Sequence, residues 1–139
     1  MAEINVTRTL ETPPAALWEV VRAFDDVRWM PDGGSGCEIQ GEGVGQVRIF
    51  DGPNGKIHEH LVARDDAAQS LTYTIPQGIP FPVTGYRSTM VVSDDGGQGA
   101  LSWTCEFEPE GATEAEAGAA VTQMYEVMIG WIADLLKKG

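Results

Sequence analysis

Apolar and polar side chains alternate at the start of the chain. The even-numbered positions from 4 to 10 are Ile4, Val6, Arg8 and Leu10, and the odd-numbered positions between them are asparagine or threonine. This period of two predicts a strand with one buried face. Apolar residues then recur at intervals of three and four up to Phe24, which predicts a short helix with Thr12 as its N-cap and Pro13 at its first position.

The middle of the chain consists of short apolar runs separated by turn residues. A second short helix or loop is expected over residues 25–31, where Trp29 and Met30 lie, and the glycine-rich residues 32–36 end it. Beyond this point, Gly, Asp-Gly or Pro separates the runs, and several connections have the length of hairpins. The pattern predicts an antiparallel meander of strands over residues 37–40, 46–50, 56–64, 70–75, 86–93 and 100–108.

The last apolar pattern has the period of a helix. Thr113 and Glu116 form a capping box, and the apolar positions that follow are Val121, Met124, Met128, Trp131 and Leu135. This helix is the only element long enough to cover the apolar face of the meander. The predicted fold class is therefore α+β: a curved antiparallel sheet, two short helices after its first strand, and a long C-terminal helix across it.

Parity assigns an inner face to each strand. Within residues 56–64 the inward side chains are Ile57, Glu59 and Leu61, and the lysine and both histidines of this segment point outward. The inward residues of the later strands are mostly apolar: Leu71, Tyr73, Ile75, Tyr86, Ser88, Met90, Val92, Leu101, Trp103, Cys105 and Phe107. A carboxylate among them needs a partner, water or a cavity. A wet, ligand-sized cavity is the simplest interpretation; the alternative is that the aromatic residues merely fill a core.

Composition and charge narrow the choice of partners. The length of 139 residues fits a single domain over residues 1–139, and the net charge of −12 argues against binding to nucleic acid or to anionic lipid surfaces. No apolar stretch is long enough to span a membrane, and no secretion signal is visible, so a cytoplasmic location is expected. Cys37 and Cys105 are expected to be free thiols. Nothing in the pattern predicts an oligomeric state.

Motifs for metal or nucleotide chemistry are weak. His58 and His60 could reach one metal ion, but both lie on the outer face without a third ligand, so no metal site is expected. The glycines of residues 41–46 are followed by a predicted strand instead of the helix that a dinucleotide loop requires. No Gly-x-Ser-x-Gly elbow is present. No cofactor is therefore expected.

Several segments resemble one protein family in their order and spacing. They are Leu17-Trp18 within residues 14–24, Gly43-Val44-Gly45-Gln46-Val47-Arg48, Glu59-His60-Leu61 followed by Asp65-Asp66, Tyr73-Thr74-Ile75 and Phe81-Pro82-Val83-Thr84-Gly85-Tyr86. Together they are similar to the polyketide cyclase/dehydrase (SRPBCC) branch of the START superfamily, whose helix-grip fold is shared with the plant pollen-allergen proteins and abscisic-acid receptors. The resemblance covers nearly the whole chain. It implies a seven-stranded sheet that grips the C-terminal helix around a cavity for a hydrophobic small molecule.

The same resemblance points to individual pocket residues. In the abscisic-acid receptors a strand glutamate and a tyrosine face the ligand, and they match Glu59, which His60 follows here, and Tyr86. The two loops at the receptors' pocket mouth correspond to residues 51–55 and 76–85. The chain lacks the receptors' Ser-Gly-Leu-Pro-Ala gate and His-Arg-Leu latch, so hormone reception is not implied.

The sequence thus predicts a protein that binds or carries a small hydrophobic molecule, such as a polyketide or a lipid. The expected ligand-binding residues are Trp29, Val47, Ile49, Glu59, Leu61, Tyr73, Ile75, Tyr86, Ser88, Trp103, Met124, Met128 and Trp131. The alternative is a polyketide cyclase/dehydratase with Glu59 as general acid or base and Tyr86 or Tyr73 as hydrogen-bond donor. No inward His or Lys is expected beside Glu59, which favours binding over catalysis. A module that binds another protein, with no cavity, is a third possibility.

Overall fold

The computed structural model describes residues 1–138. Its elements are β1 (Ala2–Leu10), α1 (Pro14–Arg22), the 3₁₀ turn η1 (Pro31–Gly34), β2 (Glu38–Gln40), β3 (Val47–Gly52), β4 (Gly55–Asp65), β5 (Ser70–Gln77), β6 (Val83–Asp95), β7 (Gln98–Pro109) and α2 (Glu114–Lys138). The seven strands form one antiparallel sheet in the order β1-β7-β6-β5-β4-β3-β2. The α+β class, the seven-stranded sheet and the long C-terminal helix are confirmed.

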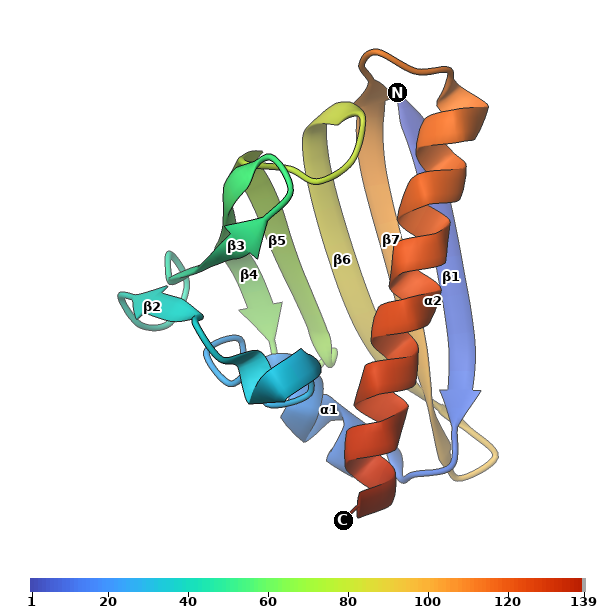
Figure 1. Ribbon diagram of the computed structural model, residues 1–139. Coiled ribbons are helices and arrows are strands. Elements are labelled where there is room, and N and C mark those ends of the chain that lie inside the picture. The colour runs from blue at the N-terminus through green and yellow to red at the C-terminus, as the bar shows by residue number, and fades with distance from the viewer. Residues whose placement is uncertain (139) are drawn as a thin grey trace.

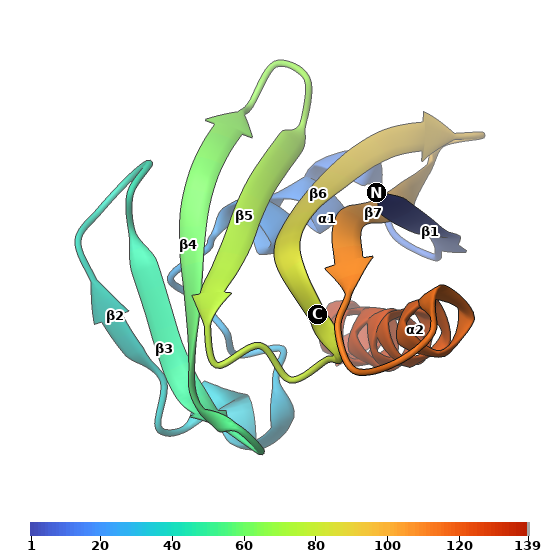
Figure 2. The same ribbon diagram turned by 90° about the horizontal axis from the view of Figure 1, so that it is seen from above.

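The long helix covers only one half of the sheet. It runs along β7 and β1 and contacts both strands (Figure 1). Seen from above, the sheet is strongly curved, and β2, β3, β4 and β5 lie to one side of α2 (Figure 2). The concave face of these strands is therefore left to be covered by other segments and by the flank of the helix.

Two faces of α2 have different surroundings. The fully buried stripe, which packs on the sheet, consists of Ala117, Gly118, Val121, Tyr125, Ile129 and Ile132. At Gly118 an added Cβ would lie 3.3 Å from Ile4 of β1, so the small residue permits this close approach. Three residues of the predicted stripe, Met124, Met128 and Trp131, lie beside it and are only half-buried. They belong to the flank that faces the uncovered strands.

The start of α2 follows the predicted capping box. The Thr113 backbone N–H donates to Glu116 Oε1 (2.9 Å), and the Glu116 backbone N–H donates to Thr113 Oγ1 (3.1 Å). Two N–H groups that lack helical partners are satisfied in this way. The bond from the Thr113 backbone N–H favours the ionised carboxylate, and it lowers the pKa of Glu116.

The two short helices differ from their predictions. Pro13 is the N-cap of α1 and makes no side-chain cap, and Pro14 occupies the first turn, so Thr12 as N-cap is wrong by one residue. Residues 25–30 form turns and irregular chain, which is the loop of the two forms expected there, and the second short helix is only η1, which begins at Pro31 and runs into the predicted glycine-rich break. Asp32 and Gly33 have positive φ there (58° and 66°), a conformation that a regular helix does not permit.

A cluster of side chains fixes α1 to the sheet. The Trp18 indole N–H donates to Asp66 Oδ1 (2.9 Å), and Arg22 Nε donates to the same oxygen (2.8 Å). Arg64 donates to the carbonyl of Arg22 at the end of the helix (3.0 Å). Because the helix ends at this anchor, the following chain turns inward and buries Phe24.

Candidate functional site

A cavity of about 610 Å³ lies between the flank of α2 and the concave face of the sheet. The turn that carries Trp29, Met30 and Pro31 closes one side, and the loop with Pro80 and Phe81 closes another. A cavity of this volume with mostly apolar walls is typical of a small-molecule site. The inward aromatic residues belong to the hydrophobic core, and Trp29, Tyr73, Tyr86 and Trp103 among them also border this cavity.

Most of the predicted ligand-binding residues meet at this cavity. The structure places in its wall Trp29, Glu59, Tyr73, Ile75, Tyr86, Trp103, Met124, Met128 and Trp131. The Trp29 and Trp131 rings lie 6.5 Å apart, so residues far apart in sequence form one side of the wall. Whether these residues contact a ligand stays a prediction.

Four of the predicted residues do not line the cavity. In the β3–β4 pairing, Val47 lies opposite His60 and Ile49 opposite His58, so both belong to the outer face of the sheet. Leu61 has the expected inward parity, but it is buried in the core, beyond the cavity. Ser88 is also fully buried and reaches the cavity only through hydrogen-bonded neighbours.

The inner face of β3 carries Arg48, which the sequence reasoning missed. Arg48 lies opposite Glu59, and both side chains are almost fully buried, with exposed fractions of 6% and 10%. Arg48 Nε donates to Glu59 Oε1 (2.5 Å), and Arg48 Nη1 donates to the carbonyl of Phe24 (3.1 Å). The guanidinium carbon also lies 4.0 Å from the centre of the Phe24 ring, a cation–π contact. The acid at position 59 is therefore paired with an arginine, a partner that the sequence analysis did not identify.

A sequence signal for Arg48 did exist. A buried carboxylate requires a partner, and Arg48 is the basic residue within the predicted strand of residues 46–50. Apolar residues occur on both parities of that strand, at Val47 and Ile49 and at Phe50. The pattern therefore did not decide whether Val47 and Ile49 or Arg48 and Phe50 form the inner face of this strand.

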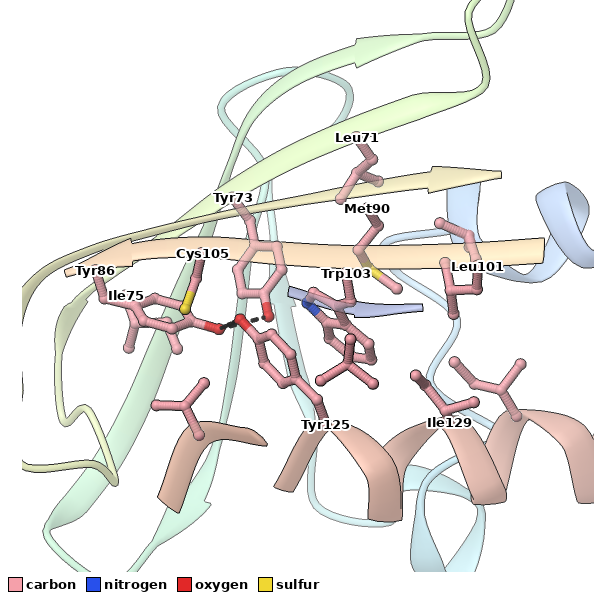
Figure 3. Packing of buried hydrophobic residues seen from close by; sticks show 14 of the residues in the cluster. Leu71, Tyr73, Ile75, Tyr86, Met90, Leu101, Trp103, Cys105, Tyr125 and Ile129 are labelled. Carbon is pink, nitrogen blue, oxygen red and sulfur yellow. Dashed lines mark hydrogen bonds between the residues drawn. The ribbon is translucent and has the colours of Figure 1, made fainter. Parts of the chain in front are cut away.

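Three phenol groups form a hydrogen-bonded cluster beside the ion pair. Tyr86 OH lies 3.1 Å from Tyr73 OH and bonds to Tyr125 OH (Figure 3). Tyr125 OH lies 2.8 Å from Ser88 Oγ, which also accepts a hydrogen bond from the Trp103 indole (2.8 Å). The Trp103 and Tyr125 rings stack with their centres 4.4 Å apart. Tyr125 was not predicted, although it follows Val121 by four residues on the buried stripe.

One phenol lies at the free end of this chain. Each hydroxyl has one proton, so the sequence Tyr73–Tyr86–Tyr125–Ser88 can be oriented in two ways. When Ser88 donates to the carbonyl of Thr104 (3.2 Å), each phenol donates to the next member toward Ser88. In the reverse orientation, Tyr73 has a proton to offer to the cavity. In both orientations the proton of Tyr86 is used inside the chain.

The phenols are expected to stay protonated far above neutral pH. Burial, followed by the negative charge of Glu59, raises the pKa of Tyr73 from 10.0 to about 12. Burial likewise raises the pKa of Tyr86 and of Tyr125 well above 10.0. The cluster therefore presents neutral hydroxyl groups to the cavity.

An alkaline titration can test this cluster, because it contains all three tyrosines of the chain. A pKa that is raised in the folded state means that the stability from the neutral phenols is complete below pH 10 and is lost as the pH rises through about 12. We expect tyrosinate absorbance to appear only together with the loss of the circular dichroism signal. Ionisation near pH 10 with an intact fold would contradict the burial of these groups.

The exposed rim of the cavity includes residues of two loops that are joined by a hydrogen bond. In the β3–β4 hairpin, Asp51 and Pro53 are exposed and line the cavity. The hairpin and the β5–β6 loop are joined where Asn54 Nδ2 donates to the carbonyl of Ile79 (3.1 Å). These segments fall within the predicted mouth loops, residues 51–55 and 76–85, although β3 to β6 extend into both ranges. On the helix side, Val127 is 43% exposed at the rim.

Other candidate chemistry lies outside this cavity. Within residues 1–138, no group of three or more His, Cys, Asp or Glu side chains is placed to hold a metal ion. Cys37 and Cys105 are free thiols, as predicted, and burial raises the pKa of Cys105 to about 11. In the same described range, no helix has the length and apolar character needed to cross a membrane.

Residues 1–136 match the family model described as polyketide cyclase / dehydrase and lipid transport. No curated protein matches the chain.

Solved structures with the same fold are numerous. A solution structure from Thermobifida fusca is 28% identical, with a TM-score of 0.83 over 99% of this chain and 95% of that one. The protein XoxI from Bacillus cereus is 24% identical (TM-score 0.79; 98% and 96% covered). Norcoclaurine synthase from Thalictrum flavum, in complex with dopamine and hydroxybenzaldehyde, is 16% identical (TM-score 0.78; 99% and 87% covered). With the helix-grip fold and the match over almost the whole length, the chain belongs to the polyketide cyclase / dehydrase and lipid transport family.

Proposed function

We propose that this protein binds a small, largely apolar molecule in the cavity beneath α2 and serves as a ligand-binding or carrier protein. The observation that carries the proposal is the cavity itself: about 610 Å³ of space, walled mainly by apolar side chains, with one ion pair and two phenols at its polar end. Apolar walls supply affinity through burial, and the few polar groups orient the ligand. A polyketide or a lipid fits this description.

A cavity-filling variant tests the proposal. The probe is N-phenyl-1-naphthylamine, a neutral dye that fluoresces when it leaves water. Met124→Trp adds bulk to the cavity wall, and we expect it to weaken dye binding about tenfold or more, a loss of roughly 1.4 kcal/mol. Val44→Trp is the matched control, because Val44 lies outside the cavity and is 61% exposed. Equal dye binding by wild type and Met124→Trp would contradict a site in this cavity.

A native mass spectrum of the protein as purified provides a second readout. A retained small molecule that is absent from Met124→Trp would support the proposal and give the mass of the natural ligand.

Acid–base catalysis is the second candidate, and one feature favours it. Glu59 faces the cavity and uses only Oε1 in its bond to Arg48, so Oε2 is available to a bound substrate. The proton donor expected with it is Tyr73 instead of Tyr86, because Tyr73 lies at the free end of the phenol chain. A cyclase/dehydratase of this kind would close a polyketone by aldol addition and then eliminate water.

A simple diketone separates a catalyst from a carrier. 2,6-Heptanedione closes to 3-methylcyclohex-2-enone with release of one water, so no oxidant or reductant is needed. A catalyst would accelerate this reaction, and Glu59→Gln would abolish the acceleration while His58→Gln, on the outer face of the same strand, would keep it. A carrier would leave the rate at that of the solution without protein.

A further inference from the structure

We propose that the Arg48–Glu59 pair selects ligands whose polar head is uncharged and offers a hydrogen-bond acceptor beside a donor, as a primary carboxamide does. This inference rests on the proposed ligand-binding function of the cavity and specifies the chemical class that the cavity accepts.

The first step concerns atoms that the fold leaves unused. Arg48 engages Nε with Glu59 and Nη1 with Phe24, and Glu59 engages Oε1. Within residues 1–138, Arg48 Nη2 and Glu59 Oε2 have no hydrogen-bond partner, and no side-chain nitrogen or oxygen is both fully buried and unpaired. The two free atoms therefore keep some accessible surface. Since both residues are at least nine-tenths buried and line the cavity, that surface belongs to the cavity.

The second step concerns how these atoms are arranged. Arginine and a carboxylate commonly form two parallel hydrogen bonds. Here a single hydrogen bond, Nε to Oε1, joins them, so Arg48 Nη2 is left as a second donor and Glu59 Oε2 as a second acceptor on neighbouring groups. A carboxamide could accept from Arg48 Nη2 through its carbonyl oxygen and donate to Glu59 Oε2 through its N–H. Such a ligand would occupy both free atoms without breaking the hydrogen bond between Arg48 and Glu59.

The third step concerns charge. The formal charges of Arg48 and Glu59 cancel, and the phenols that line the cavity are neutral. A ligand carboxylate would lie beside Glu59, and a ligand ammonium would lie beside Arg48. Either ion would leave one buried charge without compensation, which is costly in a low-dielectric site. An uncharged head avoids this cost.

The fourth step concerns rigidity. Arg48 cannot easily leave Glu59 to follow an anion, because its guanidinium lies over the Phe24 ring and is bonded to the Phe24 carbonyl. The centre of the Tyr73 ring lies 5.8 Å from the guanidinium carbon. The donor and the acceptor are therefore presented in fixed positions.

Four naphthalene probes that differ only in their head group test the proposal: 2-naphthamide, 2-acetonaphthone, 2-naphthoate and 2-naphthylmethylammonium. Calorimetry at neutral pH is expected to show that wild type binds 2-naphthamide about tenfold or more tightly than either ion, with 2-acetonaphthone in between because it offers an acceptor alone. Binding of 2-naphthoate or of the ammonium probe as tightly as 2-naphthamide would overturn the inference while leaving the proposed function intact. Failure of all four probes to bind would overturn the proposed function and the inference with it.

Two variants link the selectivity to the ion pair. Glu59→Gln keeps an acceptor for Arg48 but removes the negative charge, and we expect the preference to shift by tenfold or more toward 2-naphthoate. The double variant Arg48→Met/Glu59→Leu is expected to bind 2-acetonaphthone and to lose the preference for the amide. His58→Gln, on the outer face of β4, should behave like wild type. An unchanged preference in folded Glu59→Gln would contradict the role of the pair, and the wild-type comparison tests the inference even if a variant does not fold.

Discussion

Arg48→Met should lower the free energy of unfolding by about 3–5 kcal/mol, because it leaves the Glu59 carboxylate buried without its partner. Both side chains are at least 90% buried, with exposed fractions of 6% and 10%, so solvent can compensate little of the lost interaction. The substitution also removes the donor to the Phe24 carbonyl and the cation–π contact with its ring. Urea unfolding followed by tryptophan fluorescence measures the change.

The double variant separates this charge effect from the loss of packing. Replacing both members, in Arg48→Met/Glu59→Leu, removes the uncompensated charge, and we expect it to recover most of the stability lost in Arg48→Met. A matched control is Arg8→Met, which removes the exposed Arg8–Glu126 pair, whose side chains are 51% and 48% exposed. That change should cost about 1 kcal/mol or less. If the double variant is no more stable than Arg48→Met, the buried charge does not explain the loss.

The pair also shows where sequence reasoning succeeds and where it fails. Strict alternation placed Ile57 and Glu59 on the inner face of β4, and the structure agrees. In β3 the alternation is ambiguous, because the outer position Ile49 is as apolar as the inner position Phe50 and is itself buried. Only the pairing register, Arg48 opposite Glu59, resolves the ambiguity. Register is a property of two strands and cannot be obtained from the pattern of one.

The boundary between cavity and core was likewise beyond the sequence. Leu61 and Tyr73 both have inward parity and both are buried, but only Tyr73 borders the empty volume. The difference depends on the curvature of the sheet and on how far α2 lies from β4 and β5, neither of which periodicity encodes. On α2 itself, apolar residues occupy more than one face: Met124 borders the cavity, whereas Tyr125, one position later and not predicted, lies on the buried stripe.

The second substitution for which we expect a large loss of stability is at Gly78, which directly follows β5. A glycine at this position lets the cavity mouth close against β4. At Gly78, φ is +75°, and an added Cβ would lie only 1.9 Å from the carbonyl oxygen of Lys56. Gly85, which lies within β6 on the other arm of the hairpin, has a similar φ of +66° and nothing within 4 Å of such a Cβ. Alanine at either position carries the strain of the left-handed conformation, roughly 1–2 kcal/mol. Only at Gly78 does it also collide with backbone.

Gly78→Ala is therefore expected to be about 1–3 kcal/mol less stable than Gly85→Ala in urea unfolding, since the collision must be relieved by moving the loop or the first residues of β4. That movement would pull Ile79 away from Asn54, whose hydrogen bond joins the two loops of the mouth. Because a wider mouth admits and releases a ligand faster, stopped-flow measurements should show quicker release of N-phenyl-1-naphthylamine from Gly78→Ala than from Gly85→Ala. Equal stability and equal release rates in the two variants would mean that the contact between Gly78 and Lys56 does not hold the mouth closed.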